Sequence, residues 1–198
     1  MIAVDVEATG IDAERASVVS IGAVDLDEPT NQFYEECFIW DGAHISDESL
    51  AVTGYTREEV SKESGKQSEA ELIQNFIAWA MDRPKTHTFV GQNPRFDSDF
   101  IAAACRRSGV EFPFAYRSID THSLCWNHMV QRRATPPTDN RRSAINLDYI
   151  LEYCGLPPEP KPHNALTGAL SHAEVFNRLV YNKKVLPEFL DHDIPFHG

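Results

Sequence analysis

The sequence has few cysteines and no long apolar run, and these two shortages exclude several classes of protein. No hydrophobic stretch approaches the length of a membrane span. The N-terminus lacks a basic segment followed by an apolar core and a small-residue cleavage site, so a cytoplasmic location and no membrane partner are expected. The four cysteines are widely spaced without a CxxC pair, and we interpret them as reduced packing residues rather than zinc ligands or disulfides.

Positive charge is also scarce. The chain has 18 Lys and Arg residues against 30 Asp and Glu residues, which gives a net charge of −12. This balance argues against a protein that coats nucleic acid by charge alone. It leaves open an enzyme that contacts only the end of a strand.

What is present is the composition of an ordinary globular domain. With 198 residues, 42% hydrophobic and 24% charged, the chain can build one sizeable core. We expect a single domain over residues 1–198, with a polar loop or lobe at 131–145 and a C-terminal tail at 183–198. Strand patterns alternate with helix patterns, so the predicted fold class is α/β.

The order of the expected elements follows from apolar periodicity and capping signals. Three short-linked strands at the N-terminus predict an antiparallel meander. A Thr56-x-x-Glu59 signature predicts an extra helical turn, and a Ser68-x-x-Glu71 capping box predicts the start of a longer helix. The expected strands cover about 2–10, 17–26, 33–39, 86–91 and 119–120, and the expected helices about 47–53, 68–80, 96–108, 121–130, 147–154 and 164–182.

The first strand carries two carboxylates on one face. Asp5 and Glu7 are two residues apart in an apolar run, and residues i and i+2 of a strand point the same way. Two adjacent buried anions repel each other and are costly to desolvate, so a divalent cation with oxygen ligands is expected beside them. The alternative is an edge strand with one solvated face, and this stretch alone leaves both open.

Two further candidate residues, Asp97 and His163, each have a simple structural explanation when considered alone. Asp97 falls in the first turn of a helix, where the helix dipole favours an acidic residue. His163 stands at a helix entrance after a Pro-rich connector, where a solvated or capping role is common.

Taken in order, the three elements resemble the DEDD exonuclease superfamily in its histidine (DEDDh) branch, which includes polymerase proofreading exonucleases, oligoribonuclease and ribonuclease T. The first motif, Asp-x-Glu-x-Thr-Gly, is met at residues 5–10. The second, His-Asn-Ala-x-Phe-Asp, is met by Asn93, Phe96 and Asp97, with Gln92 and Pro94 replacing the His and Ala. The third, His-x-Ala-x-x-Asp-Ala, is met at His163, Ala165 and Ala169. The resemblance as a whole runs from residue 2 to about residue 180.

The resemblance implies a ribonuclease-H-like fold, with a mixed five-stranded sheet flanked by helices and the first strand at its centre. It also implies removal of nucleotides from a 3′ end with two divalent ions, Mg²⁺ or Mn²⁺, about 3.5–4 Å apart. Carried over, Asp5, Glu7 and Asp97 would be metal ligands, and His163 would be the general base that deprotonates water. These four residues form the expected catalytic set.

The third motif departs from the family pattern at one position. Gly168 stands where the resemblance places a fourth carboxylate ligand. Its absence is expected to weaken metal binding and turnover. His172, one helical turn away, or a water molecule could take the place of this ligand. Deliberate inactivation and close helix-to-sheet packing are the alternative explanations of the glycine.

The resemblance also implies contacts to a single-stranded nucleic acid 3′ end. The candidate substrate-binding residues are Thr9, Gly10, Ile11, Asn93 and Phe96. Ile11 would pack on the terminal base, with ordinary core packing as its alternative. Four arginines in the polar lobe (Arg132, Arg133, Arg141 and Arg142) could hold the backbone or be merely solvated.

The sequence therefore predicts a metal-dependent 3′→5′ exonuclease of single-stranded DNA or RNA, with a homodimer left open by the family resemblance. The competing hypothesis is a catalytically silent or inactivated member that binds nucleic-acid ends or a protein partner. A third is the same fold acting on dinucleotides.

Overall fold

The computed structural model describes residues 1–82 and 86–196, and its centre is a mixed β-sheet. The strand order is β4-β3-β2-β1-β5-β6. The strands are β1 (Ile2–Ala8), β2 (Val18–Asp25), β3 (Gln32–Phe38), β4 (Gln67–Ser68), β5 (Phe89–Gly91) and β6 (Ile119–Asp120). The predicted meander of β1, β2 and β3 is confirmed, and β1 lies inside the sheet between β2 and β5.

The predicted number of five strands was wrong by one. Two residues, Gln67 and Ser68, pair in parallel with Cys37 and Phe38 of β3 and so add β4 at the edge. A two-residue strand has no periodicity of its own, and it exists only because the chain passes beside β3 before the next helix starts.

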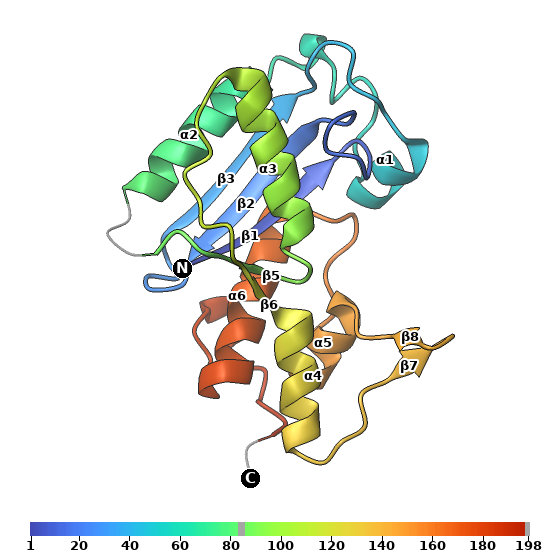
Figure 1. Cartoon of the computed structure of the whole chain (residues 1–198), viewed down its shortest axis with the longest axis vertical. Coiled ribbons are helices and arrows are strands. Elements are labelled where there is room, and N and C mark those ends of the chain that lie inside the picture. The colour runs from blue at the N-terminus through green and yellow to red at the C-terminus, as the bar shows by residue number, and fades with distance from the viewer. Residues whose placement is uncertain (83–85, 197–198) are drawn as a thin grey trace.

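Helices cover both faces of the sheet (Figure 1). The helices are α1 (Asp47–Thr53), α2 (Glu69–Met81), α3 (Arg95–Ser108), α4 (Thr121–Gln131), α5 (Leu147–Tyr153) and α6 (Ala165–Tyr181), with short 3₁₀ turns at Lys62–Ser64 and Pro187–Phe189. On one face α2 and α3 pack against Ile2, Val4 and Val6 of β1, and on the other α6 packs against Ala3. The alternation of β1 therefore directs Asp5 and Glu7, which share a face with Ala3, toward the side of α6.

Local signals located the helix boundaries well. The Ser68–Glu71 capping box forms in full, with both reciprocal hydrogen bonds at the start of α2. Thr56 and Glu59 make the same pair of bonds, 2.8 and 3.2 Å long, and the Val60 N–H donates to the Thr56 carbonyl at 3.2 Å, so the expected single turn forms there without growing into a helix. Capping hydrogen bonds stabilise a helix start without supplying the packed face that a longer helix needs.

Helix α6 approaches the sheet very closely at its first residues. Asn164 caps it by accepting hydrogen bonds from the backbone N–H groups of Leu166 and Thr167. A Cβ on Gly22 of β2 would overlap the main chain of Ala165 and Leu166. The absence of a side chain at Gly22 is therefore what lets the start of α6 rest on β2.

Arg178 fixes the segment that follows α6. The guanidinium is fully buried, and its Nε lies 2.8 Å from Glu174 Oε1 one turn earlier. Its other nitrogens donate to the main-chain carbonyls of Cys154, Phe189, His192 and Asp193. The expected tail is thus bonded to α6 as far as Asp193, and Phe196 packs on His128 of α4 and Tyr153 of α5. Residues 197–198 lie outside the described part.

The polar lobe carries a small hairpin of β7 (Thr138–Asp139) and β8 (Arg142–Ser143), and its four arginines are exposed. All four cysteines are buried and free, as predicted. Within residues 1–82 and 86–196, no helix combines the length and the apolar composition needed to cross a membrane.

Candidate active site

The two carboxylates of β1 lie side by side, Glu7 buried and Asp5 half-buried, and no basic side chain of the described residues pairs with either. Glu7 is only 7% exposed, and in the described part of the chain no hydrogen bond or ion pair holds its side chain. Burial, followed by the charges of Glu159 and Asp97, raises the pKa of Glu7 to about 8. Burial, with the charges of Asp97 and Glu7, also raises the pKa of Asp5 well above its ordinary value. Because β1 is a central strand, the solvated-edge explanation of this pair is excluded.

The open edge of β1 explains how Asp97 reaches the site. The parallel pairing of β1 with β5 covers only Ile2 and Ala3, so β1 continues beyond the end of its neighbour. The first turn of α3 fills this gap, and Asp97 Oδ1 accepts a 3.0 Å hydrogen bond from the Val6 N–H. Burial raises the pKa of Asp97 to about 7, although this backbone bond opposes the shift.

His172 makes a hydrogen bond to the same open edge of β1, two residues before Val6. Its Nδ1 lies 3.1 Å from the Val4 carbonyl, and because a carbonyl can only accept, Nδ1 carries the proton. Full burial lowers the pKa of His172 to about 4, so the ring is neutral at physiological pH.

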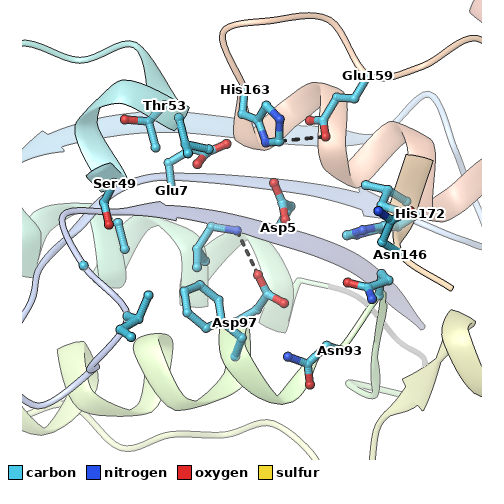
Figure 2. Close-up of a pocket in the computed structure, with 18 of the residues that line it drawn as sticks. Asp5, Glu7, Ser49, Thr53, Asn93, Asp97, Asn146, Glu159, His163 and His172 are labelled. Carbon is cyan, nitrogen blue, oxygen red and sulfur yellow. Dashed lines mark hydrogen bonds and ion pairs between the residues drawn. The ribbon is translucent and has the colours of Figure 1, made fainter. Parts of the chain in front are cut away.

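His163 stands across the pocket from these carboxylates, in the segment just before α6 (Figure 2). Its backbone N–H donates to the Val52 carbonyl at 3.1 Å, which ties this segment to α1. Its Nδ1 is 3.7 Å from Glu159 Oε2, and its side chain is 37% exposed. The imidazole is therefore held near the acidic group while it remains accessible to water.

One cavity of about 570 Å³ brings these side chains together. Most of the predicted site residues line it: Asp5, Glu7, Gly10, Ile11, Asn93, Phe96, Asp97 and His163. Residues from α1 and from the start of α5 complete the wall, among them Ser49, Val52, Asn146 and Asp148. The positions chosen from three separate motifs thus converge on a single pocket.

Thr9 is the one predicted substrate residue that the structure does not bring to this pocket. Its side chain is fully buried, and its hydroxyl donates to the His44 carbonyl at 2.7 Å while accepting from the Ser17 N–H. This hydroxyl holds together the turn after β1. Neighbouring Ile11 is 88% exposed beside the pocket, which excludes core packing for that residue.

Gly168 lies directly against the first carboxylate. A Cβ on Gly168 would stand 2.7 Å from Asp5 Cγ, closer than any normal contact. The Asp5 side chain therefore occupies the space that a residue 168 side chain would need. Glu174, further along α6, forms an ion pair with Arg178 and accepts hydrogen bonds from the N–H groups of Val185 and Leu186, so it does not replace the missing carboxylate.

Glu159 is the site residue that sequence reasoning missed. It is 8% exposed, lines the pocket, and belongs to the Pro-rich connector that was interpreted only as a spacer. The available signal was its position four residues before His163, in a segment already expected to lead into the site.

The donor set fits a hard divalent cation. Carboxylate oxygens are the ligands that Mg²⁺ and Mn²⁺ prefer, and the uncompensated Glu7 would gain a counter-charge from such an ion. Among the described residues, no three His, Cys, Asp or Glu side chains already stand close enough together to enclose an ion. Asp5, Glu7 and Asp97 are the residues that would hold such an ion.

We expect the low pKa of His172 to show in the pH dependence of stability. An unfolded histidine, with a pKa near 6.5, takes up a proton that the folded protein resists, so stability is lost as the pH falls from about 6.5 to 4. A shift of this size corresponds to about 3 kcal/mol. His172→Gln keeps a donor for the Val4 carbonyl but removes this titration.

Chemical denaturation between pH 4 and pH 7 checks this expectation. The free energy of unfolding of the wild type, minus that of His172→Gln, should fall by about 3 kcal/mol toward pH 4. Parallel curves for the two proteins would contradict a neutral buried His172.

Comparison with known proteins adds sequence relatives to this geometry. A family model for exonucleases, RNase_T, matches residues 2–176. The chain is 28% identical over 182 residues to the PolC-type DNA polymerase III of Thermotoga petrophila and equally to that of Thermotoga maritima. The match takes in 90% of this chain but only 12% of each polymerase, so the chain spans about an eighth of these curated relatives.

Solved structures share the fold at low identity. The nuclease domain of 3′hExo, a DEDDh family member bound to rAMP, superposes with a TM-score of 0.69 at 18% identity over 93% of this chain and 96% of that one. Cell-death related nuclease 4 gives 0.71 at 16% identity over 92% and 64%. Escherichia coli exonuclease I in complex with a dT13 oligonucleotide gives 0.69 at 14% identity over 89% and 40%.

These likenesses confirm the α/β, ribonuclease-H-like fold and the resemblance to DEDDh exonucleases. The family model covers nearly the whole chain, from the first residue of β1 into α6. The chain therefore belongs to the RNase_T family of exonucleases.

Proposed function

We propose that this chain is a metal-dependent 3′→5′ exonuclease that hydrolyses phosphodiester bonds at single-stranded DNA or RNA ends. The observation that carries the proposal is the convergence of Asp5, Glu7, Asp97 and His163 on one pocket. Solved relatives with the same fold are described with rAMP or with a dT13 oligonucleotide bound. A cytoplasmic location, a homodimer and the choice of Mg²⁺ or Mn²⁺ stay predictions.

The roles of the residues follow from their chemistry. Asp5, Glu7 and Asp97 would hold the divalent ions, which when bound supply positive charge at the scissile phosphate and a more acidic water. His163, which is accessible to water, accepts the proton of the attacking water at an imidazole nitrogen. Ile11 and Phe96 offer apolar surface to the terminal base.

The test is hydrolysis of 5′-labelled single-stranded oligonucleotides, DNA and RNA in parallel, with Mg²⁺, with Mn²⁺ and with chelator. We expect a metal-dependent ladder that shortens from the 3′ end. Asp5→Ala serves as the control for a contaminating nuclease and should give no ladder. A ladder that persists in chelator, or in Asp5→Ala, would contradict the proposal.

Gly168 favours a second candidate, a catalytically silent protein that binds 3′ ends. It predicts retention of labelled oligonucleotides in a filter-binding assay without any shortening. Retention that depends on a free 3′ hydroxyl, together with no turnover in either metal, would identify this case.

Ile11→Ala should weaken substrate binding without destabilising the fold. The side chain is 88% exposed, so it contributes little to the core. Losing its contact with a terminal base should raise KM about tenfold while kcat changes less. Val130→Ala, at another exposed apolar residue outside the pocket, is the matched control. Equal KM values for both variants would exclude a base contact at Ile11.

A further inference from the structure

The described pocket wall has an excess of acidic side chains over permanently charged basic ones. The lining includes Asp5, Glu7, Asp97 and Glu159, but among the described residues that line it there is no lysine or arginine. Glu7 is buried and unpartnered, and its oxygens face the cavity. Buried carboxylates without a partner are costly, so a bound cation from outside the chain would stabilise this group.

Gly168 supplies no carboxylate at the position where the family pattern has one. A Cβ there would collide with the Asp5 carboxylate as that side chain lies in the structure. An anion that completes the set therefore comes from another segment.

Glu159 reaches it from the connector before α6. Its side chain is almost fully buried, and in Figure 2 its carboxylate points into the pocket beside His163 and above Asp5. Its Oε1 lies 3.4 Å from the Thr167 hydroxyl and its Oε2 lies 3.7 Å from His163 Nδ1. Both contacts are long, so neither one satisfies the carboxylate.

The backbone around Glu159 is stiff. Pro158 precedes it and Pro160 follows it. A residue before proline is confined to extended conformations, and the φ of each proline is fixed. The carboxylate is thus delivered into the pocket by a segment that loses little conformational entropy on binding.

Glu159 lines the same cavity as the carboxylates of β1. Asp5, Glu7 and Glu159 all belong to the wall of this one pocket.

We propose that Glu159 is the fourth carboxylate ligand of the divalent-cation site, in place of the aspartate that Gly168 replaces. The inference rests on the proposed metal-dependent function and deepens it. It explains how a chain with glycine at this position retains a complete set of acidic ligands, and it removes the reason to expect weak metal binding.

The test measures Mn²⁺ binding to the full chain without substrate, by electron paramagnetic resonance of the free ion. Glu159→Gln keeps the size of the side chain and removes its charge. We expect Glu159→Gln to weaken Mn²⁺ binding at least tenfold, and Glu159→Asp to recover part of the affinity. Glu152→Gln, at an exposed glutamate on α5, carries the same charge change and should bind within about twofold of wild type.

Thermal unfolding of each metal-free variant shows that it is folded. Wild-type affinity in Glu159→Gln would overturn the inference, even if turnover fell, because that result would assign Glu159 to the positioning of His163. An equal loss in Glu152→Gln would also overturn it, since net charge would then be the cause. Mn²⁺ binding by a wild type that cuts no oligonucleotide would reject the proposed function while the comparison of variants still decides the role of Glu159.

Discussion

Asp97→Asn should abolish turnover and at the same time stabilise the metal-free protein. The amide oxygen of asparagine can still accept the Val6 N–H, so the open edge of β1 stays covered. The lost negative charge removes a metal ligand, which we expect to cost about 10³-fold or more in kcat. The same loss relieves repulsion of Asp5 and Glu7, whose pKa values the charge of Asp97 raises.

Two measurements check this result. Single-turnover hydrolysis of a labelled oligonucleotide gives the loss of activity, and denaturant unfolding at pH 8 with chelator gives the change in stability. At that pH Asp97, with its pKa of about 7, is charged in the metal-free wild type. We expect the variant to be more stable by about 2 kcal/mol. A variant that is both inactive and destabilised would show that Asp97 serves the fold rather than the ions.

Gly22→Ala should destabilise the protein strongly. Its Cβ would overlap the main chain of Ala165 and Leu166, and backbone atoms at a helix start cannot rotate away as a side chain can. Either α6 or β2 must shift, which we expect to cost about 3 kcal/mol or more. Because His163 directly precedes this helix start, the surviving folded protein should also lose activity.

The control for Gly22→Ala is Gly109→Ala. Gly109 has a φ of +66°, but its Cβ would meet no atom within 4 Å, so the cost should be only about 1 kcal/mol. Urea denaturation of both variants compares the two effects. A Gly22→Ala protein as stable as Gly109→Ala would mean that α6 does not rest on β2 as closely as described.

Features with a local cause were predictable from the sequence. The alternation of β1 predicted the shared face of Asp5 and Glu7, and the Ser68–Glu71 capping box predicted the start of α2. Each depends on residues within one turn or one strand, where side-chain type and spacing determine the geometry.

Features that depend on distant segments were not predictable in the same way. The strand β4 exists only through its pairing with β3, and Glu159 joins the site only because the connector folds back over the pocket. The buried hydroxyl of Thr9 bonds to His44, which is 35 residues away. In each case the deciding partner lies outside the window over which periodicity or capping signals act.

Arg178 fixes the path of the C-terminal segment without restricting which side chains the segment carries. The guanidinium binds main-chain carbonyls of Phe189, His192 and Asp193, and every amino acid presents such a carbonyl. The exposed side chains along this segment, such as those of Leu190 and Asp191, are therefore free to change while the route of the chain stays the same. Tolerance to substitution at these exposed positions follows because Arg178 contacts the main chain of the segment and not its side chains.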